Sequence, residues 1–207
     1  MIQRTVLAVA LVAGVHGAAT AAPVGIQLEL LQPSLVVLDP MYTETAGVDG
    51  RTVGALGLGA NAAVGDWSVA LAIDRASATT DFGLLETPSV RLAFADTRME
   101  MRWRPPLPLG GWSAQIAAGM GRRTLRYSPP SIDITTGGAT YHVVLRETST
   151  WTRHLAAEVL HAVHGNAWIA LRTSWTFYSL DVASPTGVLR QPLRDLHVGL
   201  ALRVQVY

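Results

Sequence analysis

The sequence predicts an all-β fold, namely an eight-stranded antiparallel up-and-down transmembrane β-barrel with a filled polar interior. Three observations support this prediction. Apolar residues occupy every second position in eight segments, the connections between these segments alternate between long and short, and tryptophan residues gather beside the short connections.

Residues 1–21 have the features of a secretory signal peptide. Arg4 precedes an apolar stretch that is too short to cross a bilayer as a helix, and residues 19–21 (ATA) fit the small-residue cleavage pattern. We expect cleavage after Ala21, which leaves residues 22–207 as the barrel domain. A short N-terminal anchor is the alternative for this segment.

The composition excludes several classes of function. The chain carries 16 basic and 15 acidic residues, so its near-neutral charge gives no case for nucleic-acid binding. It has no Cys, which excludes disulfides and thiolate chemistry. Hydrophobic residues make up 49% of the chain, yet after the leader no apolar stretch reaches the roughly 18 residues of a membrane helix. Alternation accounts for a hydrophobic chain without long apolar runs.

Period-two alternation predicts strands along the whole domain. In DWSVALAID (66–74) every second residue is large and apolar, and the closing segment DLHVGLALRVQVY (195–207) shows the same pattern. In the segment 141–161, polar residues keep to the same alternate positions throughout, so the segment is predicted to be part of a single strand. VRLAF (90–94) has the opposite parity to the RMEMRWR that follows, so we expect a β-bulge near Asp96 to join them.

The connections are sorted by length. Four long ones alternate with three short ones, and this asymmetry is typical of barrels with short periplasmic turns and long outer loops. We therefore expect both termini on the periplasmic side. The long connections are 39–51, 75–88, 128–139 and 181–193, and the short ones are 64–66, 105–111 and 163–166.

Aromatic residues lie at both ends of the predicted strands, as in the interfacial girdles of membrane barrels. Those beside the short connections are Trp67, Trp103, Trp112 and Trp168. Those nearer the long connections are Phe94, Tyr127, Trp151, Trp175 and Phe177.

The polar rows are predicted to face inward. They combine Gly and Ala with charged residues of both signs, which suits a crowded interior better than a solvent face. Eight strands leave room for side chains but not for an open aqueous channel, and buried charges need partners. We therefore expect a plugged barrel and not a general diffusion porin, with an interior polar network of Glu29, Asp74, Arg98, Glu100, Arg102, Arg123, Arg146, His154, Glu158, Arg172, His197 and Arg203.

The signal peptide, the alternating segments, the connection lengths and a last strand that ends in Tyr207 resemble the small outer-membrane β-barrel proteins of Gram-negative bacteria. The resemblance implies a place in the bacterial outer membrane and contact with its lipid and lipopolysaccharide. It also implies insertion by the barrel assembly machinery, which reads the last strand. Tyr207 is in phase with Arg203 and Gln205, whereas Val204 and Val206 continue the apolar row.

The expected role is structural or a surface interaction through the long loops, with an extracellular partner that the sequence does not identify. No catalytic, cofactor or metal motif is present, so we expect no cofactor and no metal. Two alternatives stay open. One is a lipid A-modifying enzyme, an acyl hydrolase or transferase, although Ser149 and His142 have opposite parity on one predicted strand. The other is a soluble periplasmic lipocalin-like barrel whose apolar face encloses a hydrophobic ligand.

Overall fold

The computed structural model describes residues 25–40, 52–80, 90–107, 110–184 and 187–206. The predicted signal peptide and Tyr207 lie outside these residues. Among the residues that the structure describes, none lies in a helix long and apolar enough to cross a membrane.

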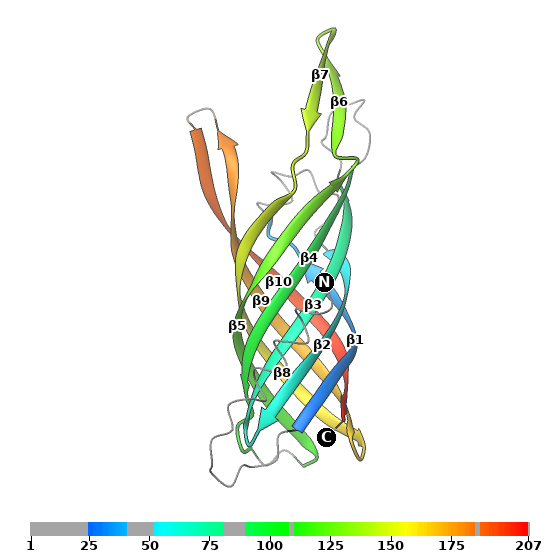
Figure 1. The fold of residues 1–207 in the computed structure, drawn as a ribbon, viewed down its shortest axis with the longest axis vertical. Helices are drawn as coiled ribbons and strands as arrows, with labels where there is room; N and C mark the ends of the chain where they lie inside the picture. The colour runs from blue at the N-terminus through cyan, green and yellow to red at the C-terminus, as the bar shows by residue number, and fades with distance from the viewer. Residues whose placement is uncertain (1–24, 41–51, 81–89, 108–109, 185–186, 207) are drawn as a thin grey trace.

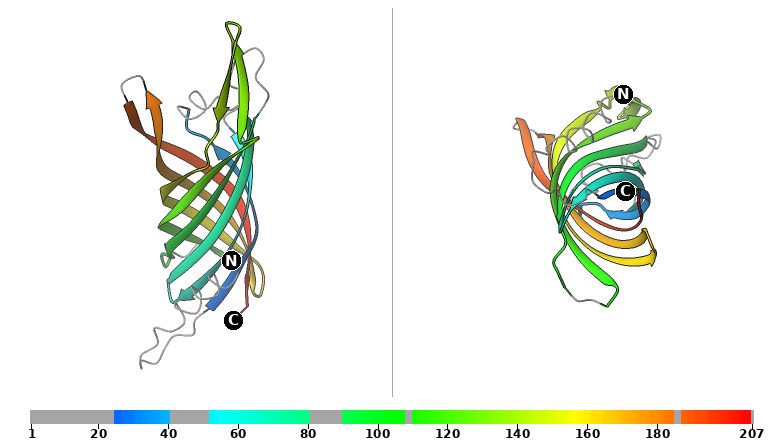
Figure 2. Two further views of the ribbon diagram at one scale, coloured as in Figure 1. Left: turned by 45° about the horizontal axis from the view of Figure 1, so that its top comes forward. Right: turned by 60° about the horizontal axis from the view of Figure 1, so that its bottom comes forward.

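Eight antiparallel strands form a closed barrel, as predicted (Figure 1). Around the ring the order is β1-β10-β9-β8-β5-β4-β3-β2, so the first and last strands pair with each other and complete the circle. Figure 2 shows the strands wrapping around a common axis. The strands are β1 (Gly25–Val37), β2 (Thr52–Val64), β3 (Trp67–Thr80), β4 (Val90–Trp103), β5 (Trp112–Ser128), β8 (Thr148–His164), β9 (Ala167–Ser184) and β10 (Gly187–Gln205).

The two ends of the barrel differ. The turn end holds the short connections β2–β3, β4–β5 and β8–β9 together with the start of β1 and the end of β10. At the opposite end, the hairpin end, β6 (Ser131–Thr136) and β7 (Ala139–Val144) form a separate two-stranded sheet that stands clear of the barrel (Figure 1). Gly137 and Gly138 have φ of 59° and 79°, and a type I′ hairpin turn requires positive φ at both of its central positions.

A second hairpin extends from β9 and β10. Their pairing continues to Gly187 opposite Ser184, beyond the last β8–β9 pair at Phe177 and the last β1–β10 pair at Leu196. The segments 128–139 and 181–193 were predicted as long connections, but the structure places strand within both. β6 begins at Ser131, and β9 and β10 continue to Ser184 and from Gly187.

The outer face of the barrel is apolar and its inner face is polar, which is the reverse of a soluble protein. Leu58, Met101, Ile116, Leu171 and Leu200 are each at least half exposed, whereas the charged rows are buried. An apolar surface of this extent fits lipid and not water. The arrangement contradicts the lipocalin-like alternative, because the apolar residues face outward and do not enclose a cavity.

Aromatic side chains flank the apolar surface. At the turn end, the rings of Trp67 and Trp103 lie 6.2 Å apart, and Trp112 lies 4.3 Å from the ring of His161. Trp151, 73% exposed, lies nearer the hairpin end. Phe94 does not join this belt as predicted, because its side chain is buried inside the barrel.

The structure shows no bulge in β4. Its pairing with β3 and β5 is continuous, and even-numbered residues face the interior along the whole strand. The apolar row seems to change sides in the sequence because the inward-facing residues differ along β4. They are charged at Arg98 and Glu100 and apolar at Leu92 and Phe94. Register shifts occur instead in β1, between Leu30 and Ser34, and in β8, between Ala162 and His164.

A charge on the apolar surface is expected to destabilise the barrel. Leu171 lies opposite Leu200 and midway between Trp168 and Trp175 along β9. We expect Leu171→Arg to cost about 2–4 kcal/mol in a bilayer, since arginine there must leave water. Urea unfolding of the protein in lipid vesicles, followed by the heat-dependent mobility shift on gels, measures this cost.

The matched control is Val188→Arg in the β9–β10 hairpin, where the side chain is 76% exposed beyond the barrel wall. This change is expected to stay within about 0.5 kcal/mol of the parent. Equal, small effects of the two substitutions would mean that the apolar face does not meet lipid.

Candidate functional site

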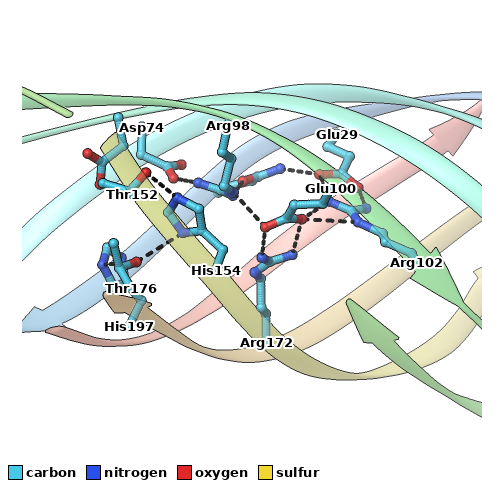
Figure 3. A network of polar contacts seen from close by, with 12 residues as sticks. Glu29, Asp74, Arg98, Glu100, Arg102, Thr152, His154, Arg172, Thr176 and His197 are labelled. Atoms are coloured by element: carbon cyan, nitrogen blue, oxygen red, sulfur yellow. Dashed lines mark hydrogen bonds and ion pairs between the residues drawn. The ribbon is translucent and has the colours of Figure 1, made fainter. Parts of the chain in front are cut away.

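Eight charged side chains cross the middle of the barrel. We name them the central cluster, and Figure 3 shows its main contacts. Four arginines face four carboxylates, so the cluster carries no net charge. Its members are Glu29, Asp74, Arg98, Glu100, Arg102, Glu158, Arg172 and Arg203.

Glu100 is at the centre of this cluster. Arg98 Nε donates to Glu100 Oε1 at 2.9 Å, and Arg102 Nη2 donates to Glu100 Oε2 at 3.1 Å. Arg172, from the opposite wall, donates to the same carboxylate at 3.0 Å through Nη1. Arg98 also pairs with Asp74 on β3. One buried carboxylate thus joins three guanidinium groups.

Glu29 organises the part of the cluster nearer the turn end. Arg102 Nη2 donates to Glu29 Oε2 at 3.1 Å, and Arg203 Nε lies 2.9 Å from Glu29 Oε1. Asn61 Nδ2 donates to the same oxygen at 3.1 Å. Arg203 also pairs with Glu158, so β1, β4, β8 and β10 are joined across the lumen.

Small residues on facing strands make room for these long side chains. A Cβ atom at Gly119 would lie 2.2 Å from the carbonyl oxygen of Met99, and one at Gly121 would lie 2.4 Å from that of Thr97. At Gly57, the space for a Cβ is taken by the carboxylate of Asp74. Glycine is therefore required sterically where neighbouring backbone or a charged side chain comes close.

A histidine–threonine layer lies next to the central cluster (Figure 3). His154 contacts Thr152 through Nε2 at 2.7 Å and Thr176 through Nδ1 at 3.1 Å. The hydroxyl of Thr176 lies 3.3 Å from Nε2 of His197. All four side chains are buried, so the layer links β8, β9 and β10 inside the barrel.

Arg123 is the centre of an upper cluster. Its Nε and Nη2 donate to Asp96 at 2.8 and 2.7 Å, and Nη1 pairs with Asp195. The guanidinium carbon lies 4.9 Å from the ring centre of Phe94 and 4.4 Å from that of Tyr178. Aromatic faces on a buried guanidinium add cation–π attraction to the ion pairs.

An apolar cluster fills the interior beyond Arg123, and we name it the apolar cap. Its members come from seven strands and from the residue after β1. They fill the lumen near the hairpin end. They are Val36, Leu38, Val53, Ala76, Ala78, Leu92, Phe94, Leu125, Tyr178 and Leu193.

Two hollows lie among the described interior side chains. One, beside Gln32, Arg98 and Arg172, has a volume of about 30 Å³, which is enough for water. The other opens at the turn end beside Gln27, Ser68 and Gln115 and has a volume of about 180 Å³. The central cluster, the histidine layer, the upper cluster and the apolar cap follow one another along the axis. Their ion pairs and packed apolar side chains occupy the lumen between the two ends and join strands across it.

Eleven of the twelve residues predicted for the interior network lie inside the barrel, and Arg146 does not. Arg146 is exposed between β7 and β8, because the segment 141–161 is not one strand: the chain returns from the β6–β7 hairpin and β8 begins at Thr148. This is a correction to the sequence prediction.

Ser149 and His142, whose alternation argues against a hydrolase pair, have separate partners in the structure. His142 Nδ1 lies 2.7 Å from Asp133 on the hairpin, and Ser149 Oγ lies 3.2 Å from Thr124 Oγ1 on the barrel wall.

Sequence reasoning missed Asp96, Asp195 and Tyr178 in the upper cluster. Asp96 has the parity of Arg98 and was overlooked because a bulge was expected there. Asp195 stands next to the expected loop 181–193. Even-numbered residues of β4 and odd-numbered residues of β10 face the interior up to the ends of these strands. Continuing these two rows along the sequence identifies both aspartates.

No known protein-family profile matches the chain, and no curated protein matches it in sequence. Solved structures do match in fold. Neisserial surface protein A shares 11% identity at a TM-score of 0.57, over 90% of this chain and 99% of that one. The outer membrane protein OprG from Pseudomonas aeruginosa shares 11% identity at a TM-score of 0.50, over 90% and 97% of the two chains. This chain therefore has the fold of the small eight-stranded outer-membrane β-barrels.

Proposed function

We propose that this protein is a sealed barrel of the bacterial outer membrane that holds two hairpins at the cell surface for binding. The observation that supports this role most directly is the β6–β7 hairpin, which stands clear of the barrel and exposes large apolar side chains. Tyr141 and Val144 are 56% and 59% exposed.

The β9–β10 hairpin has the same character. Val188 and Leu189 are 76% and 61% exposed, and both lie beyond the barrel wall that would contact lipid. Large apolar side chains that face water mark binding surfaces on folded proteins. The β6–β7 sheet also has two strands only, so its backbone edges are available for pairing with an extended partner.

The filled interior supports a binding role over conduction. The described part of the lumen is occupied by paired charges and by the apolar cap, so solutes have no wide path along the axis. On this proposal the protein inserts into the membrane through the barrel assembly machinery, and its strands contact outer-membrane lipid.

The test shortens the hairpin without disturbing the barrel. Ile132 pairs with Val143, so replacing residues 133–142 by Asn-Gly keeps the base of the hairpin and closes it with a favoured turn. Cells that express the full chain are expected to aggregate, or to adhere to plates coated with fibronectin, laminin or collagen, more than cells with an empty vector. The shortened variant is expected to lose this adhesion.

Two measurements accompany the test. The shortened variant must show the same heat-dependent mobility shift in the outer-membrane fraction, which controls for folding. The full chain in planar bilayers is expected to give no conductance steps. Adhesion that survives shortening of the hairpin, or a full chain that adheres no better than the empty vector, would overturn the proposal.

A further inference from the structure

A groove lined by arginines lies on the outer wall of the barrel. We name it the arginine groove; it is a hollow of about 1000 Å³ over β3, β4 and β5 toward the hairpin end. Four exposed arginines line it, while the residues between them are small. The arginines are Arg75, Arg91, Arg122 and Arg126, and the small residues are Ser77, Ala93, Ala95, Thr124 and Ser149.

The strand register arranges these arginines in two tiers. Arg75 lies opposite Ala95 of β4, and Arg91 lies four residues further along the same strand. Arg122 and Arg126 are also four residues apart on β5, and their side chains share the outer face. Four residues of strand span about 13 Å. The groove therefore carries its arginines in two tiers, whose backbone positions are about 13 Å apart along the strands.

The positive charge of the groove is only partly neutralised. Glu147 pairs with Arg126 at 2.8 Å, and Arg91 donates to the hydroxyl of Ser77 at 3.0 Å. Within the part of the chain that the structure describes, no carboxylate contacts Arg75 or Arg122. The interior clusters, in contrast, match every arginine with at least one carboxylate.

An apolar hollow of about 550 Å³ adjoins the groove and shares Arg122 and Thr124 with it. Its other outer-face side chains are Thr97 and the apolar Leu71, Met99, Met120 and Trp151. Met99, Met120 and Trp151 are 52%, 57% and 73% exposed. Along this wall, apolar side chains that can contact acyl chains are followed, toward the hairpin end, by arginines that can bind anions.

We propose that this wall binds a phosphorylated glycolipid of the outer leaflet, with phosphate groups on the arginine groove and acyl chains on the apolar hollow. Guanidinium groups bind phosphate bidentately, which makes arginine a strong phosphate ligand. Two arginine tiers suit a headgroup that carries two phosphates. The inference rests on the outer-membrane location in the proposed function, and it adds a lipid class and a site.

The test uses the full-length protein, refolded in detergent, and diphosphorylated lipid A as the probe. Native mass spectrometry counts the lipid molecules retained per barrel. The variant Arg75→Gln/Arg122→Gln removes the two arginines that have no carboxylate partner among the described residues. We expect its apparent affinity to fall roughly thirtyfold, since each arginine near a charged lipid surface contributes about a factor of five.

The matched control is Arg190→Gln/Arg194→Gln, which removes two exposed arginines of β10 and the same charge. It is expected to bind as the parent does. Dephosphorylated lipid A is expected to bind the parent as weakly as diphosphorylated lipid A binds the groove variant. Inorganic phosphate at millimolar concentration is expected to compete poorly, because it lacks the acyl chains.

Equal losses in the groove and control variants, or equal binding of both lipids, would overturn the inference. The mobility shift of each variant shows whether it is folded. The hairpin-shortened chain keeps the groove and is expected to bind lipid normally. Lost lipid binding with intact cell adhesion would overturn only the lipid site, and the reverse result would overturn only the surface role.

Discussion

Replacing Arg102 by Met is expected to destabilise the barrel by about 3–5 kcal/mol, because it leaves buried carboxylates without their partner. Arg102 has no exposed surface and pairs with both Glu29 and Glu100. Methionine fills part of the same volume, so the charge is the main loss. The free energy of unfolding in lipid vesicles, from urea titration and gel mobility, measures the effect.

Two further variants isolate the cause. Arg102→Met/Glu29→Gln removes a charge of each sign and is expected to recover most of the lost stability. Arg126→Met breaks the pair with Glu147 on the outer wall, where the two side chains are 70% and 52% exposed. A surface pair of this kind contributes about 1 kcal/mol or less. If Arg102→Met proves as mild as Arg126→Met, the interior charges are solvated and the barrel is not sealed.

Gly119→Ala is expected to prevent efficient folding, at a cost of about 3 kcal/mol or more, because a single methyl group must displace backbone. Its Cβ would lie 2.2 Å from the oxygen of Met99 and 2.9 Å from the Cα of Glu100. The neighbouring strand must move, and that movement shifts the arginine contacts of Glu100. The fraction of protein that shows the mobility shift after refolding reports this loss.

Gly54→Ala is the matched control on β2. A Cβ at Gly54 would have no heavy atom within 4 Å. This substitution is expected to be neutral, or to add a few tenths of a kcal/mol by restricting the unfolded chain. Normal refolding of Gly119→Ala would show that the strands at this position lie further apart than the structure places them.

The fold was predictable because lipid imposes one rule on every strand. A membrane barrel must place apolar side chains outward at every second residue, so segments such as β3 and β10 carry the period in their own sequence. The rule weakens toward the hairpin end. There the interior of β4 turns apolar at Leu92 and Phe94, and alternation no longer tells which side faces in.

The partners inside the lumen were not predictable for a different reason. Glu29 and Arg102 are 73 residues apart, and they meet because of the stagger between strands around the ring. Sequence parity shows that both face inward, but not that they lie at the same height. Arg146 was predicted to face inward from the alternation of polar residues, but it lies outside the barrel. Alternation does not show where a strand begins or ends.

The ion pairs of the central cluster also connect strands that are not neighbours. Arg102 on β4 reaches Glu29 on β1, and Arg172 on β9 reaches Glu100 on β4; in each case two strands lie between the partners around the ring. Arg203, on the last strand, pairs with Glu29 on the first. An open sheet would therefore carry unmatched charges that lipid penalises, and closure of the seam between β1 and β10 neutralises them together. The interior ion pairs thus favour the complete ring over an open sheet in the membrane.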